Sequence, residues 1–277
     1  MKLPDYTVIN GKGAVKMFQT VFKRYEKKYI IDVGQYEEVK NYLTYNTVPD
    51  EYGKSRVCSL YYDTPGNRLI RASLDKPIYK EKLRLRSYGV PTADKPCFLE
   101  LKKKYKGIVF KRRISAPYTD IKSYMAGEDS GIENSQILKE IDYFRRFYGC
   151  LKPAADIFYD REAFYDQTDS SVRLTFDSNV LARGWDLELE NGIYGERVLE
   201  NGLYILEVKT SGAMPMWIAE MLNEFKIYPT SFSKYGTAYK NGLLTRENKK
   251  IITSLEAENI NNNIGRRILC LTVYFQQ

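Results

Sequence analysis

The sequence has no histidine among its 277 residues. This absence excludes Ser-His-Asp triads, imidazole general bases and histidine-ligated metal centres. The cysteines are Cys58, Cys97, Cys150 and Cys270, and no two of them form a Cys-x-x-Cys pair. A zinc site or a thiol redox motif is therefore not expected, and the cysteines are interpreted as small apolar residues in a reducing compartment.

Long apolar stretches are also missing. No run of about 18 apolar residues is present, which is the length that a membrane-spanning helix needs. The N-terminal sequence, MKLPDYTVIN, lacks the apolar core of a signal peptide. These absences predict a cytoplasmic protein without a transmembrane segment.

What the sequence does have is basic charge. Its 43 Lys and Arg residues exceed its 35 Asp and Glu residues, which gives a net charge of +8. Such an excess favours a polyanionic partner, either nucleic acid, a membrane surface or a phosphate-rich small molecule. A hydrophobic content of 43% is that of a folded, globular protein.

The pattern of apolar residues predicts an α+β protein. Residues 79–114 contain three strand-like runs separated by turn signals, and such short connections imply antiparallel neighbours. Further strands are expected at 22–33, 55–64, 155–166, 171–180 and 203–212, and helices at about 35–43, 133–149, 215–225 and 231–243. Residues 119–134 are interpreted as a polar loop.

Charged residues occupy alternate positions in most of these strands. A strand points residues i and i+2 to the same side, so Arg84 and Arg86 share one face while Leu83 and Leu85 share the other. The basic residues of this charged face are Arg24, Lys28, Arg84, Arg86, Lys102, Lys111, Arg113, Arg161, Arg173 and Lys209, and its acidic residues are Glu26, Glu100, Glu207 and Asp177. Ten basic residues against four acidic ones leave most of the positive charge without an opposite charge on a neighbouring strand.

Two interpretations of the charged face are open. Antiparallel sheets often place one charged face in water. The excess of one sign favours instead a sheet that closes into a barrel, with the charged face inside and the apolar face under helices. Cations inside a barrel are costly unless an anion neutralises them. This arrangement predicts a passage that holds a polyanion such as a chain of phosphates, whose oxygens suit Arg and Lys.

A series of short motifs follows in a fixed order along the chain. They are Glu26-Lys27-Lys28-Tyr29, SLYYDT, Leu-Arg-Leu-Arg, Leu-Glu-Leu-Lys, Lys-Arg-Arg, Tyr-x-Arg-x-Ala-Phe, Arg-x-Thr-x-Asp, Leu-Glu-Val-Lys and Ser-Phe-Ser-Lys-Tyr. Over residues 20–242 this ordered set resembles the VTC domain, the polyphosphate polymerase branch of the CYTH-like triphosphate tunnel metalloenzymes. The resemblance implies a closed tunnel of eight antiparallel strands with a charged interior, flanked by helices. It divides the chain into a lead-in at 1–19, the domain at 20–245 and a tail at 246–277.

The resemblance also implies an activity and its residues. Such domains transfer the terminal phosphate of ATP to a growing inorganic polyphosphate chain, with Mn²⁺ or Mg²⁺ as cofactor. Carried over by position, the catalytic residues are Lys28, Arg84, Arg86, Lys102, Arg161 and Lys209. The substrate-binding residues are Lys111, Arg173, Tyr159, Ser233 and Lys234, and the metal ligand is Glu207.

The chemistry agrees with this residue set. Phosphoryl transfer depends on positioning and charge neutralisation, so the missing histidine is no obstacle. The hydrolytic relatives begin with Glu-x-Glu-x-Lys, whereas this chain has Arg24-x-Glu26-x-Lys28. One carboxylate fewer weakens a two-metal arrangement and favours transfer over hydrolysis.

Several alternatives stay open at this stage. A tripolyphosphatase or nucleoside triphosphatase of the same fold and a non-catalytic polyanion-binding module are the competing functions. Glu26 and Glu100 are either second metal ligands or, more in keeping with their neighbours, ion-pair partners, and Ser233 is also a candidate helix N-cap. ATP and polyphosphate are the expected partners. Nucleic acid is not expected, because the residues that alternate with the basic ones are mostly aliphatic. A membrane partner and the oligomeric state stay open.

Overall fold

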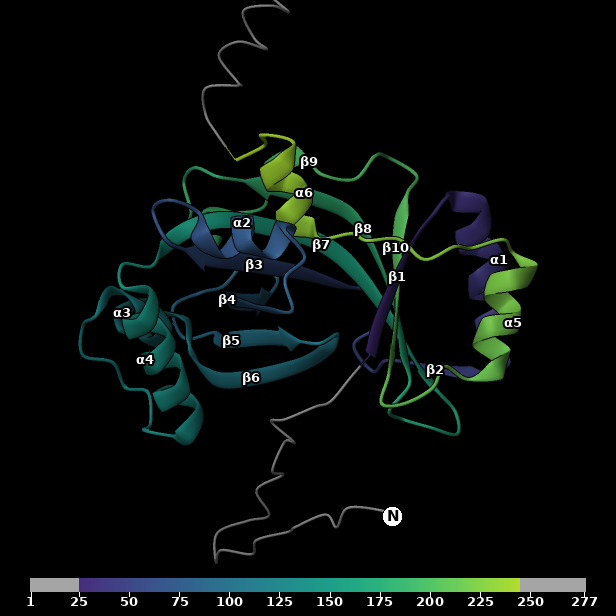
Figure 1. Ribbon diagram of the computed structural model, residues 1–277, viewed down its shortest axis with the longest axis horizontal. Helices are drawn as coiled ribbons and strands as arrows, with labels where there is room; N and C mark the ends of the chain where they lie inside the picture. The colour runs from purple at the N-terminus through teal and green to yellow at the C-terminus, as the bar shows by residue number, and fades with distance from the viewer. Residues whose placement is uncertain (1–24, 245–277) are drawn as a thin grey trace, which may run out of the picture.

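The computed structural model describes residues 25–244 (Figure 1). Arg24, Cys270, the expected lead-in at 1–19 and the expected tail at 246–277 lie outside the described residues. Within them, no helix is long and apolar enough to cross a membrane.

The described chain forms a ten-stranded sheet with helices around it. The strands are β1 (Tyr25–Ile31), β2 (Thr47–Pro49), β3 (Ser55–Asp63), β4 (Tyr79–Tyr88), β5 (Pro96–Tyr105), β6 (Ile108–Pro117), β7 (Lys152–Asp166), β8 (Arg173–Arg183), β9 (Glu196–Arg197) and β10 (Tyr204–Thr210). The helices are α1 (Val33–Leu43), α2 (Arg68–Leu74), α3 (Tyr118–Ala126), α4 (Gln136–Tyr148), α5 (Met216–Glu224), α6 (Lys234–Lys240) and the short 3₁₀ helix η1 (Leu189–Asn191).

Eight strands follow one another in the order β1-β10-β8-β7-β3-β4-β5-β6, and all neighbours are antiparallel. β2 pairs with β7 and β9 pairs with β8 outside this path. The antiparallel sheet and its flanking helices confirm the α+β class.

The prediction of a closed tunnel is wrong for the hydrogen-bonded sheet, because the edge strands β1 and β6 do not pair in the described residues. Closure requires strand tilt and stagger to bring both edge strands into hydrogen-bond register. In the described part of the chain, β1 pairs with β10 along its whole length, and it approaches β6 without forming a ladder. Side chains bridge this gap, because Lys102 Nζ of β5 donates to Glu26 Oε2 of β1 at 2.6 Å.

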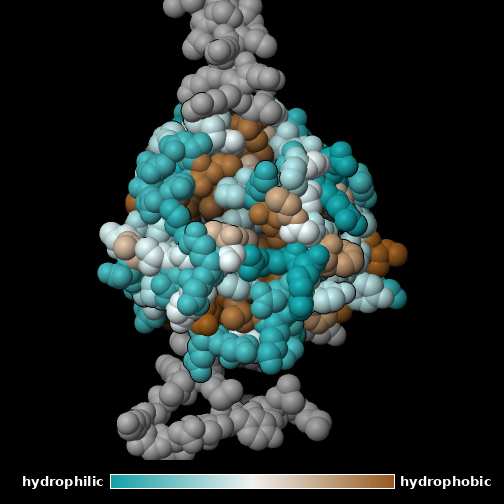
Figure 2. All heavy atoms as spheres, turned by 90° about the vertical axis from the view of Figure 1, so that its left-hand side faces the viewer, coloured by the Kyte–Doolittle hydropathy of each residue, from teal (hydrophilic) through white to brown (hydrophobic). Residues whose placement is uncertain are grey.

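Apolar residues on the outer face of the sheet are covered by helices on two sides (Figure 1). Leu83, Leu85, Leu99 and Leu101 pack with Ile121 of α3 and Ile141 of α4. Leu174, Phe176, Leu206 and Val208 pack with Val39 of α1 and Ile218 of α5. Figure 2 looks onto the side formed by α3 and α4, where hydrophilic residues surround small hydrophobic patches. Both groups of apolar residues lie on the outer face, so the charged residues of these strands are on the opposite face.

Helix α6 lies on this other face, over β3, β7 and β8. Its Tyr235 and Ala238 pack with Tyr61 and Ile157. The Tyr235 hydroxyl donates to Asp63 Oδ2 at 3.1 Å, and this buried carboxylate also accepts from backbone N–H groups of α2. The contacts fix the start of α6, where Ser233 and Lys234 stand, against the sheet.

The expected polar loop at 119–134 is wrong in its first half, which is helix α3. Tyr118, Ile121 and Tyr124 are buried at helical spacing, and the polar residues between them hid this pattern. The helix ends at Gly127, whose φ of +86° suits glycine. Helix α2, which has only seven residues, was also not expected.

Candidate functional site

The charged face of the strands forms a concave surface whose side chains meet, here named the inner face. Its basic residues are Lys28, Lys80, Lys82, Arg84, Arg86, Lys102, Lys104, Lys111, Arg113, Arg161, Arg173, Lys209 and Lys234, and its carboxylates are Glu26, Glu100, Asp177 and Glu207. Residues from distant strands touch, since Arg86 Nη2 of β4 donates to the Tyr159 hydroxyl of β7 at 3.1 Å.

Glu100 is the centre of one charge cluster on the inner face. Its carboxylate is fully buried and accepts from Arg84 Nε at 2.8 Å and from Arg113 Nη2 at 2.8 Å, and Lys111 Nζ lies 2.5 Å away. Arg86 Nη1 is 3.8 Å from the same carboxylate. Burial alone would raise the pKa of Glu100, but the four cations hold it well below its usual range. One carboxylate therefore balances only part of the charge of four cations.

A second cluster lies where β1 and β10 face β5. Glu207 is flanked by Lys209 Nζ at 2.9 Å and Lys28 Nζ at 3.8 Å. Burial alone would raise the pKa of Glu207, whereas Lys209, Lys28 and Lys102 hold it well below its usual range. The carboxylate is thus ionised near pH 7. Glu26 stands beside it in an ion pair with Lys102.

Asp177 organises a third cluster. Arg161 donates to both of its carboxylate oxygens, at 2.6 and 2.7 Å, and Lys234 Nζ donates to Oδ2 at 2.5 Å. Both cations lie over the ring of Tyr159, at 5.1 Å for Arg161 and 4.3 Å for Lys234. Asp177 is therefore an ion-pair partner that holds Arg161 and Lys234 in place.

Nearly all of the sequence-predicted site residues come together on the inner face. Arg173 stands apart at one end, where Nη2 donates to Asp50 Oδ2 at 2.9 Å. Ser233 is the N-cap of α6, because its Oγ accepts from Gly236 N at 3.2 Å. The same Oγ accepts from Lys82 Nζ at 3.1 Å, so the cap also belongs to the site. The roles of all these residues in binding and catalysis stay predictions.

Lys80, Lys82 and Tyr61 are inner-face residues that were not found from the sequence. Lys82 precedes Arg84 by two positions, so the same alternation pointed to it, and it has no ion pair within the described residues. Tyr61 accepts from Arg84 Nη1 at 3.1 Å and lies beneath its guanidinium. It gave no signal, because residues 57–62 of β3 contain no charged side chain that could reveal an alternation.

Lysines gather at one end of the inner face. In the register of β4 and β5, Lys80 is opposite Lys104 and Lys82 is opposite Lys102. Like charges directly opposite each other destabilise a sheet. Among these four lysines only Lys102 has an ion pair with a described carboxylate, Glu26. This end of the inner face is accordingly suited to an anion.

The sequence matches the model of the VTC domain over residues 23–242. The chain belongs to the VTC domain family. The match covers nearly all of the described residues and every cluster of the inner face. A comparison with curated proteins finds none that matches.

Three of the similar solved structures have low sequence identity to this VTC domain. A Bacillus halodurans protein described as a candidate adenylate cyclase has a TM-score of 0.51 at 13% identity, and the alignment covers 78% of this chain and 96% of that one. A Hippeastrum protein, described as a candidate adenylyl cyclase with a dominant triphosphatase activity, gives 0.45 at 15% identity, with 81% and 98% covered. The Mimivirus capping enzyme triphosphatase gives 0.32 at 12% identity, with 73% and 89% covered. The fold is that of the CYTH-like triphosphate tunnel proteins.

Two carboxylates of the VTC domain fit a divalent cation. Glu207 is ionised, and its negative charge acts on the neighbouring Glu26. The described residues contain no group of three or more Cys, Asp or Glu side chains that could hold a metal ion. Mg²⁺ and Mn²⁺ are commonly held by one or two carboxylates, with phosphate oxygens and water as the other ligands. The donor set therefore fits an ion that is bound together with a phosphate substrate.

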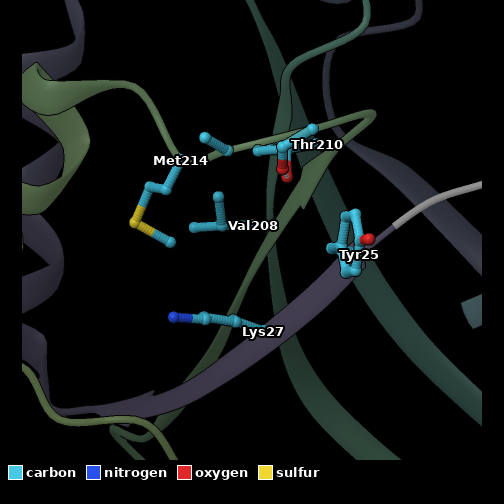
Figure 3. A pocket seen from close by; sticks show the side chains of 7 residues that line it. Tyr25, Lys27, Val208, Thr210 and Met214 are labelled. Atoms are coloured by element: carbon cyan, nitrogen blue, oxygen red, sulfur yellow. Dashed lines mark hydrogen bonds between the residues drawn. The ribbon is translucent and has the colours of Figure 1, made fainter. Parts of the chain in front are cut away.

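A separate hollow of the VTC domain lies on the outer side of β1 and β10. Figure 3 shows its lining, with Tyr25 and Lys27 on one side and Thr210 and Met214 on the other. Lys27 is on the opposite face of β1 from Glu26 and Lys28. The hollow therefore has no part in the charge clusters of the inner face.

Several inner-face groups titrate near neutral pH. Burial lowers the pKa of Lys111 to about 7 and that of Lys82 to about 8. Burial alone would raise the pKa of Tyr61, but Arg84 and Lys82 lower it to about 7. The inner face therefore loses positive charge as the pH rises above about 7.

We expect binding of tripolyphosphate to take up protons. An anion stabilises the charged lysines and the neutral tyrosine, so its affinity falls as the pH rises from about 7 to 9.

The free energy of unfolding of the ligand-free protein changes in the opposite sense. Each of these groups has a folded pKa below its unfolded value, so the unfolded chain binds more protons and stability rises from about pH 7 to 10. For the binding prediction, calorimetry in two buffers of different ionisation enthalpy measures the number of protons taken up with tripolyphosphate. Binding without proton uptake would contradict that prediction.

Proposed function

We propose that this VTC domain is a metal-dependent polyphosphate polymerase that transfers the terminal phosphate of ATP to inorganic polyphosphate. The observation that carries the proposal is the charge of the inner face, where thirteen basic side chains from seven strands and α6 meet four carboxylates. A buried excess of cations is costly unless an anion neutralises it. A linear chain of phosphates offers charge along its whole length, as the inner face does.

Unpartnered polar atoms support the same ligand. Arg86 Nε, Ser59 Oγ and Thr175 Oγ1 are buried and lack a hydrogen-bond partner. All three belong to inner-face positions of their strands. Buried polar groups are nearly always hydrogen-bonded in folded proteins, so unpartnered ones point to a bound group. Phosphate oxygens accept from guanidinium and hydroxyl donors alike.

The reaction needs no general base. A terminal oxygen of the chain attacks the γ-phosphorus of ATP, the bond from this phosphorus to the β–γ bridging oxygen breaks, and ADP leaves with the bonding electrons. The attacking phosphate is already ionised near pH 7. Arg84, Arg86 and Arg161 position the phosphates and neutralise their charge. A divalent ion held by Glu207 and Glu26 would neutralise further phosphate charge.

The test is product analysis on a gel that resolves phosphate chains. The full chain is incubated with ATP and Mn²⁺, and with Mg²⁺ in parallel. We expect a ladder of polyphosphate together with ADP. Release of ADP and orthophosphate alone would overturn the proposal and assign the tripolyphosphatase or nucleoside triphosphatase activity instead. Binding of triphosphate without turnover would assign a non-catalytic polyanion-binding module.

Neighbouring lysines of β5 provide a matched pair of variants. Lys102 is on the inner face in an ion pair with Glu26, whereas Lys103 is on the outer face, with Nζ 3.9 Å from Glu140. We expect Lys102→Met to lower the rate of polyphosphate formation about tenfold or more, because a charge-assisted contact to phosphate is lost. Lys103→Met should leave the rate within about twofold. Equal rates for the two variants would contradict an active role of the inner face.

A further inference from the structure

The inner face of β4 and β5 changes in character along its length. Lysines occupy one end, as described, and Arg84 and Glu100 occupy the middle. At the other end the alternation places aromatic rings, with Tyr88 two residues beyond Arg86 on β4 and Phe98 two residues before Glu100 on β5. This gradient gives the inner face two chemically different ends.

The aromatic end is joined directly to the charged centre. The Arg113 guanidinium lies 4.3 Å above the ring of Phe98 and also donates to Glu100 Oε1 at 2.8 Å. The rings of Phe98 and Tyr88 meet edge to face, with centroids 6.0 Å apart. Phe98 is directly opposite Arg86 in the register. Phe98 and Arg86 are therefore on neighbouring strands, whose backbones are about 4.8 Å apart.

Packing does not account for these rings. Neither Phe98 nor Tyr88 belongs to the three apolar clusters of the described chain. Tyr88 is 44% exposed, although its neighbours Arg86 and Ser87 are buried. Phe98 is partly exposed. Accessible aromatic rings beside a cation, next to a charged centre, are typical of a surface on which a nucleobase stacks.

We propose that Phe98 and Tyr88 bind the base of a nucleoside triphosphate whose phosphates lie on Arg84 and Arg86. The inference rests on the proposed function for the phosphates and adds the site of the base. It gives the inner face a direction. The base lies at the Tyr88 end, the terminal phosphate points toward the Lys80 end, and the lysines there hold the polyphosphate chain that accepts it.

The test compares two ligands that share a triphosphate and differ in the base. A non-hydrolysable imido analogue of ATP and inorganic tripolyphosphate are titrated into the full chain by calorimetry, each with Mn²⁺. We expect Phe98→Leu, which keeps an apolar side chain, and Tyr88→Ala, at an exposed position, each to weaken binding of the ATP analogue about tenfold. Binding of tripolyphosphate should stay within about twofold of the original chain.

Tyr105→Ala is the matched control, because Tyr105 is 46% exposed at the opposite end of β5 and on its outer face. It should change neither affinity. An equal loss for both ligands in Phe98→Leu and Tyr88→Ala, or no loss for the ATP analogue, would overturn the assignment of the base. If the unaltered chain binds neither ligand, the proposed function fails as well, so the two failures are distinguishable.

Discussion

Replacing Glu207 by glutamine should abolish turnover and leave triphosphate binding largely intact. The carboxylate is ionised among Lys28, Lys209 and Arg161, and it is the group expected to hold the divalent ion. Glutamine keeps the size and one oxygen but removes the charge. We expect the rate of ADP formation to fall by at least about 100-fold, since changes in groups that merely support metal ligands already cost 10- to 100-fold.

Two measurements separate loss of a metal ligand from loss of an ion pair. Binding of tripolyphosphate without metal should be unchanged or tighter in Glu207→Gln, because the variant loses a negative charge beside the anion. The gain in affinity that Mn²⁺ gives the original chain should disappear. A variant that keeps its activity, or keeps its response to Mn²⁺, would show that Glu207 only pairs with lysines.

Replacing Glu100 by glutamine should destabilise the protein by about 3 kcal/mol or more. The carboxylate is fully buried and balances Arg84, Arg86, Lys111 and Arg113. Removing one partner of a buried ion pair leaves uncompensated charge, which typically costs about 3 to 5 kcal/mol. For a domain of this size the melting temperature should fall by roughly 10 °C. Deprotonation of Lys111 removes the charge of only one of the four cations, so the three arginines still lack a compensating carboxylate.

The same variant should respond strongly to polyanions. Tripolyphosphate supplies the missing negative charge, so it should raise the melting temperature of Glu100→Gln by more than it raises that of the original chain. Glu140→Gln is the control, because Glu140 pairs with Arg112 and Lys103 on the outer face. It should cost about 1 kcal/mol or less and leave the response to tripolyphosphate unchanged. Similar behaviour of the two variants would contradict a phosphate site around Glu100.

The alternation of charge was the most informative sequence signal. It assigned Arg84, Lys102 and Arg161 to one face of their strands, and the structure places that face inside. This succeeds because the period of a strand is fixed by backbone geometry. The ordered motifs predicted the family, which the match over 23–242 confirms.

Other features depend on contacts that local patterns do not contain. Closure of the sheet requires the edges of β1 and β6 to reach hydrogen-bond register, and this is a property of the whole sheet. Asp177 holds both Arg161 and Lys234, which are far apart in the sequence. Tyr61 belongs to the inner face through the packing of α6 and through Arg84. Such relations follow from the tertiary fold alone.

The central claim is that the inner face binds a chain of phosphates, and a crystal structure with tripolyphosphate tests it most directly. The expected density lies on the inner face, in contact with Arg84, Arg86, Arg161 and Lys234. One end of the chain should reach toward the lysines of β4 and β5. Tripolyphosphate bound only on the outer face, with the inner-face ion pairs unchanged, would contradict the account.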